Sequence, residues 1–272
     1  MSERVAQPLR PAHGMEEIRF RGHRGGVISM HRALTHFRLG PMNLLASISL
    51  CLVFSTVWVI LLPSLCSFWR DFLNLSLRLL PLHGTLELAE HRFGSYRLEI
   101  PYLRIYSMLP SLGTWSLTCL ITLLLFAATM VLPKKLTPVV YLTRGILLVQ
   151  ASALLYFALW PMSFPHAPDS YMEALITSGI GLISVVPLLF GLTYYIFDFG
   201  LWKKALITGL TMAHLTLFLP FQVVLQALLL QKTILFMPVL YIIFGMPVDV
   251  LLIIALYSWG MTWSFREQKA SL

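Results

Sequence analysis

Long apolar stretches recur along most of the chain. Six of them hold about 18 or more mostly apolar residues, which is the length a helix needs to cross the hydrocarbon of a membrane. They are apolar on every side, whereas the strands of a membrane barrel alternate between apolar and polar residues. The pattern therefore predicts a bundle of six transmembrane helices, at about Met42–Leu62, Trp115–Leu132, Pro138–Trp160, Ala174–Phe197, Ala205–Leu230 and Ile234–Trp263.

Two further patterns lie between the first and second predicted spans. Apolar residues recur with helical spacing from Leu65 to Leu80, where Pro81 ends the pattern. Thr85–Ala89 and Tyr96–Ile100 then alternate with period two, which predicts a β-hairpin. Because a lone hairpin is marginally stable in water, we expect it to pack on the bundle, on the membrane surface or on another protein. The fold class is thus an all-α membrane bundle with a small extracytoplasmic helix-plus-hairpin cap, which either covers the bundle or serves as a docking platform.

A basic amphipathic segment precedes the first span. Between residues 27 and 38 apolar side chains recur with helical spacing, and the other side carries His31, Arg32 and Arg38. Gly40 and Pro41 end this pattern. A basic amphipathic helix next to a span is expected to lie in the membrane interface against anionic lipids. The three basic residues are therefore candidate lipid contacts, and a simple anchor is favoured over a partner-binding segment.

Basic residues mark one side of the predicted bundle. Seven arginines precede the first span, and the loop between spans three and four holds Asp169 and Glu173 but no lysine or arginine. Cytoplasmic loops of membrane proteins are enriched in lysine and arginine, so both chain ends are predicted to be cytoplasmic. The other basic residues that support this orientation follow even-numbered spans: Lys134, Lys135, Lys203, Lys204, Arg266 and Lys269.

These predictions divide the chain into five parts. A basic cytoplasmic segment and the first span are followed by the extracytoplasmic loop, the remaining five spans and a short cytoplasmic tail. The corresponding residues are 1–41, 42–62, 63–114, 115–263 and 264–272.

Composition excludes a soluble protein. Apolar residues make up 57% of the 272 positions and charged residues only 12%, about half of what a soluble domain carries. The net charge of +8 is explained by the cytoplasmic bias and by attraction to anionic headgroups. It is not accompanied by a nucleic-acid-binding motif, so we expect no nucleic acid among the partners. The expected partners are a bilayer with anionic lipids and other membrane proteins, and the bacterial inner membrane is the favoured location.

Polar residues inside the predicted spans are the candidate functional groups, because ionisable side chains are costly in hydrocarbon. Asp249 follows Pro247 near the middle of the last span, and His214 reaches a similar depth in span five. Spans five and six are tightly connected, so a contact between Asp249 and His214 is reasonable. Such a contact could relay protons, compensate the charge of a cationic substrate or simply hold the two helices together. The other members of this predicted polar path or interhelical pairing are Gln150, Thr211, Gln222 and Gln226.

Motifs of common enzymes are not found. The chain has no metalloprotease, nucleophile-elbow, Walker or dinucleotide motif, and its three cysteines follow no metal-binding spacing. We therefore predict no catalytic residue, metal or cofactor. The favoured function is a non-enzymatic membrane subunit or scaffold of a cell-envelope assembly. The alternatives are a transporter or channel-like protein that uses the polar path and, third, an intramembrane enzyme acting on a lipid-linked substrate.

Overall fold

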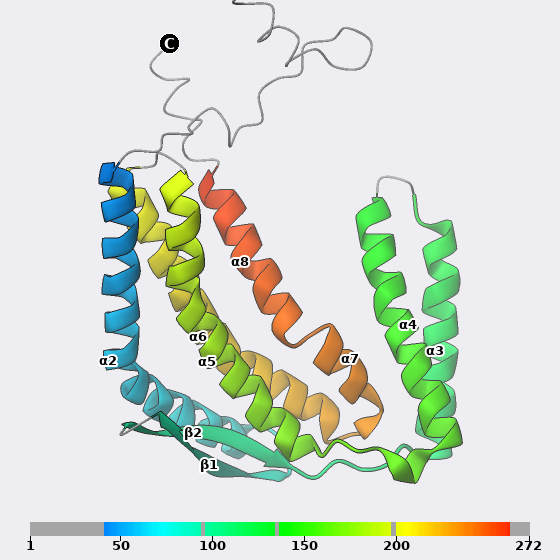
Figure 1. Ribbon diagram of the computed structural model, residues 1–272. Helices are drawn as coiled ribbons and strands as arrows, with labels where there is room; N and C mark the ends of the chain where they lie inside the picture. Colours follow the sequence, from blue (N-terminus) through cyan, green and yellow to red (C-terminus); the bar gives the residue numbers. More distant parts are fainter. Residues whose placement is uncertain (1–40, 94–95, 134–135, 197–199, 262–272) are drawn as a thin grey trace, which may run out of the picture.

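The computed structural model describes residues 41–93, 96–133, 136–196 and 200–261, and these parts are mainly helical (Figure 1). Six segments are long and apolar enough to span a membrane, as the sequence predicted. The elements in chain order are α2 (Pro41–Leu79), β1 (Gly84–Phe93), β2 (Tyr96–Ile105), α3 (Leu112–Val131), α4 (Thr137–Leu159), η3 (Pro161–Ser163), α5 (Pro168–Ile196), α6 (Leu201–Leu230), η4 (Ile234–Phe236), α7 (Met237–Ile242) and α8 (Met246–Met261).

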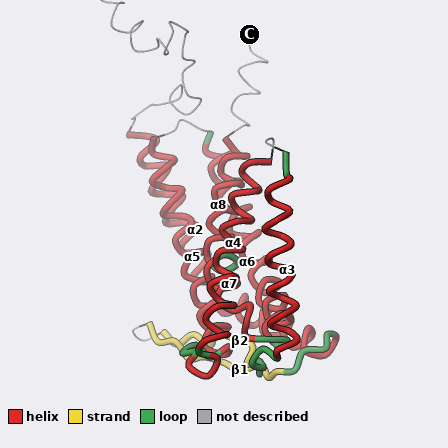
Figure 2. The backbone as a smooth tube through the Cα atoms, turned by 90° about the vertical axis from the view of Figure 1, so that its right-hand side faces the viewer, coloured by secondary structure: helices red, strands yellow, loops and turns green. Residues whose placement is uncertain are grey.

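The two strands lie across one end of the helices, and we call this the ribbon end (Figures 1 and 2). The first described residue, Pro41, and the last, Met261, both lie at the opposite end, which we call the terminal end. Six long apolar segments run between these two ends, so the described chain begins and ends on the same side of the bundle. The predicted amphipathic helix with His31, Arg32 and Arg38 lies outside the described residues.

Helix α2 is much longer than the predicted first span. It continues past Pro63 without a break in its assignment, but it bends, and its later part runs across the ribbon end (Figure 1). A proline inside a helix removes one backbone hydrogen bond and favours such a bend. Beyond the bend, buried residues recur every three or four positions, as expected for a helix that covers the core: Cys66, Trp69, Leu73 and Ser76.

The predicted hairpin is confirmed, and its strands are longer than expected. β1 and β2 pair antiparallel in continuous register, from Gly84 opposite Ile105 to Phe93 opposite Tyr96. β2 packs against α2, α5 and α6, whereas β1 packs mainly against α2. The buried side chains of β2, Leu98, Ile100, Leu103 and Ile105, belong to the main hydrophobic core.

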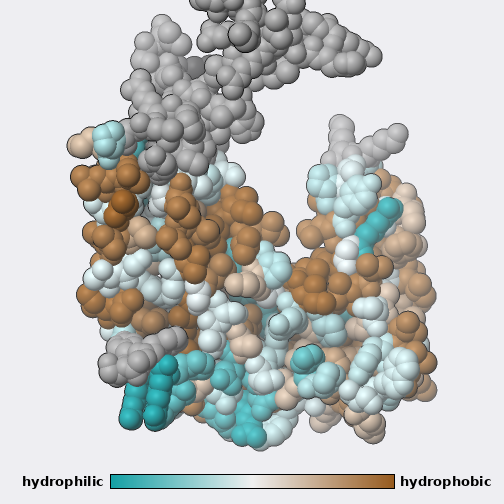
Figure 3. Space-filling model, viewed as in Figure 1, coloured by the Kyte–Doolittle hydropathy of each residue, from teal (hydrophilic) through white to brown (hydrophobic). Residues whose placement is uncertain are grey.

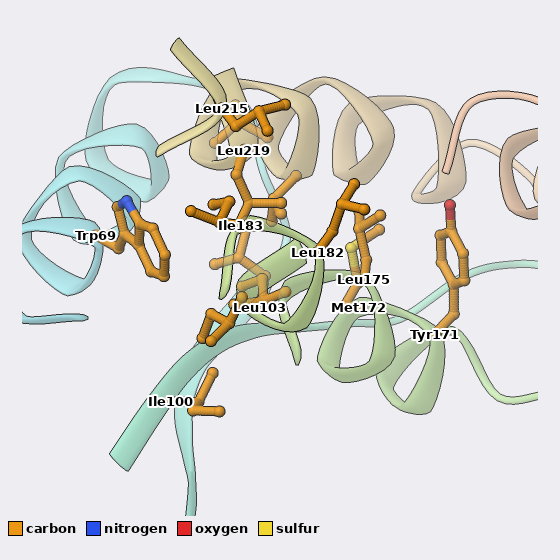
Figure 4. Close-up of a cluster of buried hydrophobic side chains, with 14 of the residues drawn as sticks. Trp69, Ile100, Leu103, Tyr171, Met172, Leu175, Leu182, Ile183, Leu215 and Leu219 are labelled. Atoms are coloured by element: carbon orange, nitrogen blue, oxygen red, sulfur yellow. The ribbon is translucent and has the colours of Figure 1, made fainter. Parts of the chain in front are cut away.

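The core lies between α2, α5, α6 and the ribbon (Figure 4). Trp69 of α2 is only 1% exposed, and its indole N–H donates to the Thr216 carbonyl of α6 at 3.0 Å. Gly179 of α5 leaves room for the Leu219 side chain of α6, because a Cβ there would lie 2.6 Å from a Leu219 methyl carbon. Small residues of this kind let helix backbones approach closely inside a membrane.

Helices α3 and α4 pack as a pair at the side of the other helices, and Leu154 and Phe157 of α4 belong to the main hydrophobic core. The two helices pack on each other, and α4 also contacts α7 and η4 near the ribbon end. At the terminal end a notch separates this pair from the rest of the molecule (Figure 3). The pair is held by hydrogen bonds of its own, from the Trp115 indole to the Leu154 carbonyl at 2.9 Å and from Arg144 Nε to Thr129 Oγ1 at 3.1 Å.

Candidate functional site

The predicted last span is broken near its middle. α7 ends at Ile242 and α8 begins at Met246, with Gly245 between them. Proline has no N–H, so Pro247 cannot continue the helical hydrogen bonding. The next amide, that of Val248, donates to the Gly245 carbonyl at 3.2 Å instead of the Phe244 carbonyl, its partner in a regular helix. The Phe244 carbonyl is thereby released from helical hydrogen bonding.

Two glutamines of α6 satisfy the Phe244 carbonyl. The side-chain N–H groups of Gln222 and Gln226 donate to this oxygen at 2.5 and 2.7 Å. Their spacing of four residues places both amides on one face of the helix. Because a carbonyl only accepts, the atom nearest to it must be the amide nitrogen in both side chains, which fixes their orientation.

Tyr171 of α5 completes this network. Its hydroxyl donates to the carbonyl oxygen of Gln226, so one chain of hydrogen bonds links α5, α6 and the helix break. The Tyr171 ring also lines a cavity of about 500 Å³ together with His166, Ser170 and Tyr241. The network therefore lies beside a cavity near the ribbon end of α5 and α7.

One polar atom of the network has no partner. The carbonyl oxygen of Gln222 is buried and accepts no hydrogen bond from the described residues. An unsatisfied buried polar atom costs about 1–3 kcal/mol. A second cavity, of about 210 Å³, lies against Gln222 and is otherwise lined mainly by aromatic and aliphatic side chains of α6, α7 and α8.

Asp249 and His214 lie on different helices and have different surroundings. Asp249 lies in the first turn of α8 and is 4% exposed, and it makes no hydrogen bond or ion pair within the described chain. His214 is exposed on α6, where its ring stacks on that of Phe218 with centroids 5.8 Å apart. Among the described residues no hydrogen bond or ion pair joins Asp249 to His214, and the contact suggested by the sequence stays a prediction.

The other predicted polar residues lie in different parts of the structure and have different partners. Gln222 and Gln226 meet at the helix break, where both donate to the Phe244 carbonyl. Thr211 is buried and donates to the Ile207 carbonyl of its own helix at 2.8 Å. Gln150 is buried with an unpartnered amide nitrogen, but it lies on α4, which packs on α3 and α7. Within the described residues, the hydrogen bonds of this set bring Gln222 and Gln226 to the helix break, whereas that of Thr211 stays within its own helix.

A second polar group lies on the outward side of the ribbon. Arg104 Nη1 lies 2.9 Å from Glu87 Oε1, and the Tyr102 hydroxyl donates to Oε2 at 2.8 Å. The hydrogen bond from Arg104, followed by that from Tyr102, lowers the pKa of the Glu87 carboxyl below its usual value. The hydrogen bond that the Tyr102 hydroxyl donates to Glu87 raises the pKa of Tyr102. This group ties the two strands together on their solvent side.

Sequence reasoning did not identify Tyr171 or the Phe244 carbonyl as members of the site. A tyrosine at the start of a span resembles an ordinary interface residue, and the glutamine partner is 55 residues away. The available signal was the pair of glutamines with helical spacing in α6, together with Gly245 and Pro247 in the last span.

The assembled groups are amides, a phenol and a backbone carbonyl, which are uncharged near neutral pH. Such groups can fix a broken helix and bind a neutral ligand through hydrogen bonds. No group of histidine, cysteine and carboxylate side chains suited to a metal is found among the described residues. No family model, curated protein or solved structure matches the chain.

Proposed function

We propose that the protein is a non-enzymatic, multi-pass subunit or scaffold of a cell-envelope assembly that presents its ribbon to an extracytoplasmic partner. The observation that carries this proposal is the unequal packing of the two strands. β2 buries four apolar side chains in the core, whereas β1 is the other strand of a two-stranded sheet and contacts mainly α2. The ribbon is therefore a fixed platform with one strand left for a partner.

The proposed orientation rests on charge. Lysines and arginines cluster near both chain ends and in or next to the connections from α3 to α4 and from α5 to α6. We assign this end of the bundle to the cytoplasm. Both ends of the described chain lie there, opposite the ribbon (Figure 1). The favoured location is the bacterial cytoplasmic membrane, with anionic lipids near the basic residues.

The outer strand has the chemistry of a strand-binding edge. Leu88 is 44% exposed, and the charged residues Glu90 and Arg92 are exposed on the same strand. A strand edge presents unpaired N–H and C=O groups that a partner strand can bind, and exposed side chains add specificity. A segment of another envelope protein that adds along β1 is the partner this edge fits.

Photocrosslinking in cells tests this proposal. A photoreactive amino acid at Leu88 is expected to give one adduct of defined mass with another envelope protein, identified by mass spectrometry. The same group at Leu124, which is 60% exposed on α3, should give lipid products without that adduct. Leu88→Lys should reduce the size of the native assembly, whereas Thr85→Lys, at another exposed position of β1, should have less effect. A free monomer with no specific adduct at Leu88 would contradict the proposal.

A transporter is the second candidate, and the helix break favours it. Broken helices commonly form binding sites inside transporters, and Asp249 is buried one turn beyond this break. Asp249→Asn removes the charge and nearly preserves the shape of the side chain. It should abolish function if Asp249 moves ions or binds a cation, and it should leave a scaffold and its adduct at Leu88 intact.

A further inference from the structure

A cavity of about 250 Å³ lies between the bend of α2 and the ribbon, and we call it the bend cavity. Residues of α2 with helical spacing form one wall: Pro63, Cys66, Ser67 and Arg70. Residues of both strands form the other wall: Leu88, Arg97, Leu98 and Glu99. The bend cavity therefore joins an apolar floor to charged side chains that come from two different elements.

Two arginines line the bend cavity with most of their hydrogen-bond donors unused. The Arg70 side chain is 46% exposed, its Nη2 donates to Ser67 Oγ at 3.5 Å, and its Nε lies 3.9 Å from Asp71 Oδ1. Arg97 is exposed and makes no hydrogen bond or ion pair with the other described residues. Because a guanidinium group carries five N–H donors, both side chains remain able to bind an anion.

The charge of the walls matches an anion with one negative charge. Glu99 is the third charged residue that lines the bend cavity, so the walls carry a net charge of one positive unit. The strand register places Arg92 opposite Arg97 and Glu90 opposite Glu99, so neither wall charge is neutralised across the ribbon. A phosphodiester carries one negative charge, and its oxygens are the acceptors that two guanidinium groups fit best.

The bend cavity lies where α2 stops crossing the bundle. At Pro63 the helix leaves the direction of its apolar span and turns across the ribbon end (Figure 1). Val59 and Ile60 precede Pro63 by four and three residues, which places them on the same side of α2, and they are 55% and 68% exposed. In a membrane these apolar side chains contact lipid tails. A lipid with its phosphate in the bend cavity can therefore lay its chains along α2.

We propose that the bend cavity binds the phosphate of a membrane phospholipid. The guanidinium groups of Arg70 and Arg97 donate to the phosphate oxygens, and the acyl chains run past Val59 and Ile60 into the bilayer. A diacylglycerol lacks the charged acceptor, and inorganic phosphate lacks the chains. This binding depends on the ribbon end lying at the membrane boundary. It depends neither on which side of the membrane that end faces nor on a partner of β1.

A matched pair of lipid probes tests this site. The full-length protein in micelles of an uncharged detergent is irradiated with a phosphatidylglycerol that carries a diazirine in one acyl chain, or with the diacylglycerol that has the same chains. Mass spectrometry measures labelling of α2 between residues 56 and 67. The phospholipid should label this segment at least about tenfold more, the factor that one hydrogen bond to a charged group provides. Equal labelling by the two probes would overturn the proposal.

Inorganic phosphate distinguishes a lipid from a water-soluble ligand. An excess of sodium phosphate should reduce labelling by phosphatidylglycerol no more than sodium chloride of the same ionic strength does, because free phosphate gains nothing from the apolar side of α2. Displacement of the lipid by phosphate beyond this salt effect would show that the bend cavity takes a soluble phosphate, and it would overturn the proposal.

Variants at exposed positions locate the effect. Arg70→Gln combined with Arg97→Gln should reduce phosphatidylglycerol labelling to the level of the diacylglycerol. Arg78→Gln combined with Arg92→Gln is the matched control, because it removes the same charge from exposed positions of α2 and β1 outside the bend cavity. Ser67→Trp should also abolish labelling by filling the bend cavity while both arginines stay in place. Equal losses in the two double variants, or undiminished labelling in Ser67→Trp, would overturn the proposal.

Discussion

Helices α5 and α6 and helices α3 and α4 are two antiparallel pairs of similarly apolar segments, yet they are packed differently. In the most apolar stretches of α5 and α6, 50% and 56% of the residues are buried, against 17% and 28% in α3 and α4. Lipid tails are as apolar as leucine, so the same sequence pattern serves both cases. The apolar pattern of a span therefore predicts crossing but does not distinguish protein neighbours from lipid.

The largest expected contrast concerns two tryptophans, Trp69 of α2, which packs on α6, and Trp115 of α3, which packs on α4. Trp69 and Trp115 each donate to a backbone carbonyl of another helix, but Trp69 is buried in the core and Trp115 is half-buried. Trp69→Ala should lower the free energy of unfolding by about 3–5 kcal/mol. Trp115→Ala should cost less than half as much, and Trp202→Ala, at a position 77% exposed, is the control. Reversible unfolding in mixed micelles measures the difference, and equal losses at Trp69 and Trp115 would contradict the contrast.

A glycine pair gives the next effect. Gly179→Leu should cost about 1–3 kcal/mol, because the new side chain must displace Leu219, whose methyl carbon would lie 2.6 Å from the added Cβ. Gly145→Leu on α4 should cost nothing, since no atom lies within 4 Å of a Cβ at that position. The same unfolding assay applies. A neutral Gly179→Leu would show that α5 and α6 are less closely packed than described.

Polar contacts should show a smaller contrast. Gln226→Leu leaves the Tyr171 hydroxyl without its acceptor and removes one donor from the Phe244 carbonyl, which should cost about 1–3 kcal/mol. Thr129→Val on α3 removes an acceptor from Arg144, which is only half-buried and can turn to water, so the cost should stay below about 1 kcal/mol. A larger loss from Thr129→Val than from Gln226→Leu would reverse the comparison.

The smallest expected effect belongs to the outward side of the ribbon. The pKa of Glu87 is lowered in the folded protein, so its stabilising contribution is complete above the ordinary pKa of glutamate and is lost as the pH falls through the lowered value. Arg104→Gln should raise the pKa of Glu87 toward that ordinary value, and NMR titration of the labelled carboxyl measures the change. Salt should weaken the interaction, because both groups are exposed to solvent. An unchanged pKa in Arg104→Gln would show that the pair does not form in solution.

Much of the fold followed from the sequence. Six helices long and apolar enough to span a membrane and the two-stranded hairpin were predicted from periodicity and length. Element ends were less accurate: α2 continues past Pro63 because a proline bends a helix without having to end it. The opposite occurred in the last span, where Pro247 together with Gly245 breaks the helix instead of only bending it.

The site was only partly predictable, because side-chain direction decides it. Thr211 and His214 are three residues apart on α6, yet one is buried and the other exposed, since three residues rotate 300° and leave them 60° apart. Gln222 and Gln226 were predicted as polar residues of one helix face, and the partner that they share is a backbone oxygen. A released carbonyl has no signature in side-chain composition, so its position became visible only with the fold.

Labelling of engineered cysteines tests the central claim, that the ribbon and the chain ends lie on opposite sides of the membrane. In spheroplasts, Glu99→Cys, at an exposed position of β2 outside the proposed partner-binding strand, should react with a membrane-impermeant maleimide before lysis, and Lys269→Cys only after lysis. The wild-type protein is the control, because Cys51, Cys66 and Cys119 lie within apolar helices. Labelling of both engineered cysteines before lysis, or of neither, would contradict the topology and the role proposed for the ribbon.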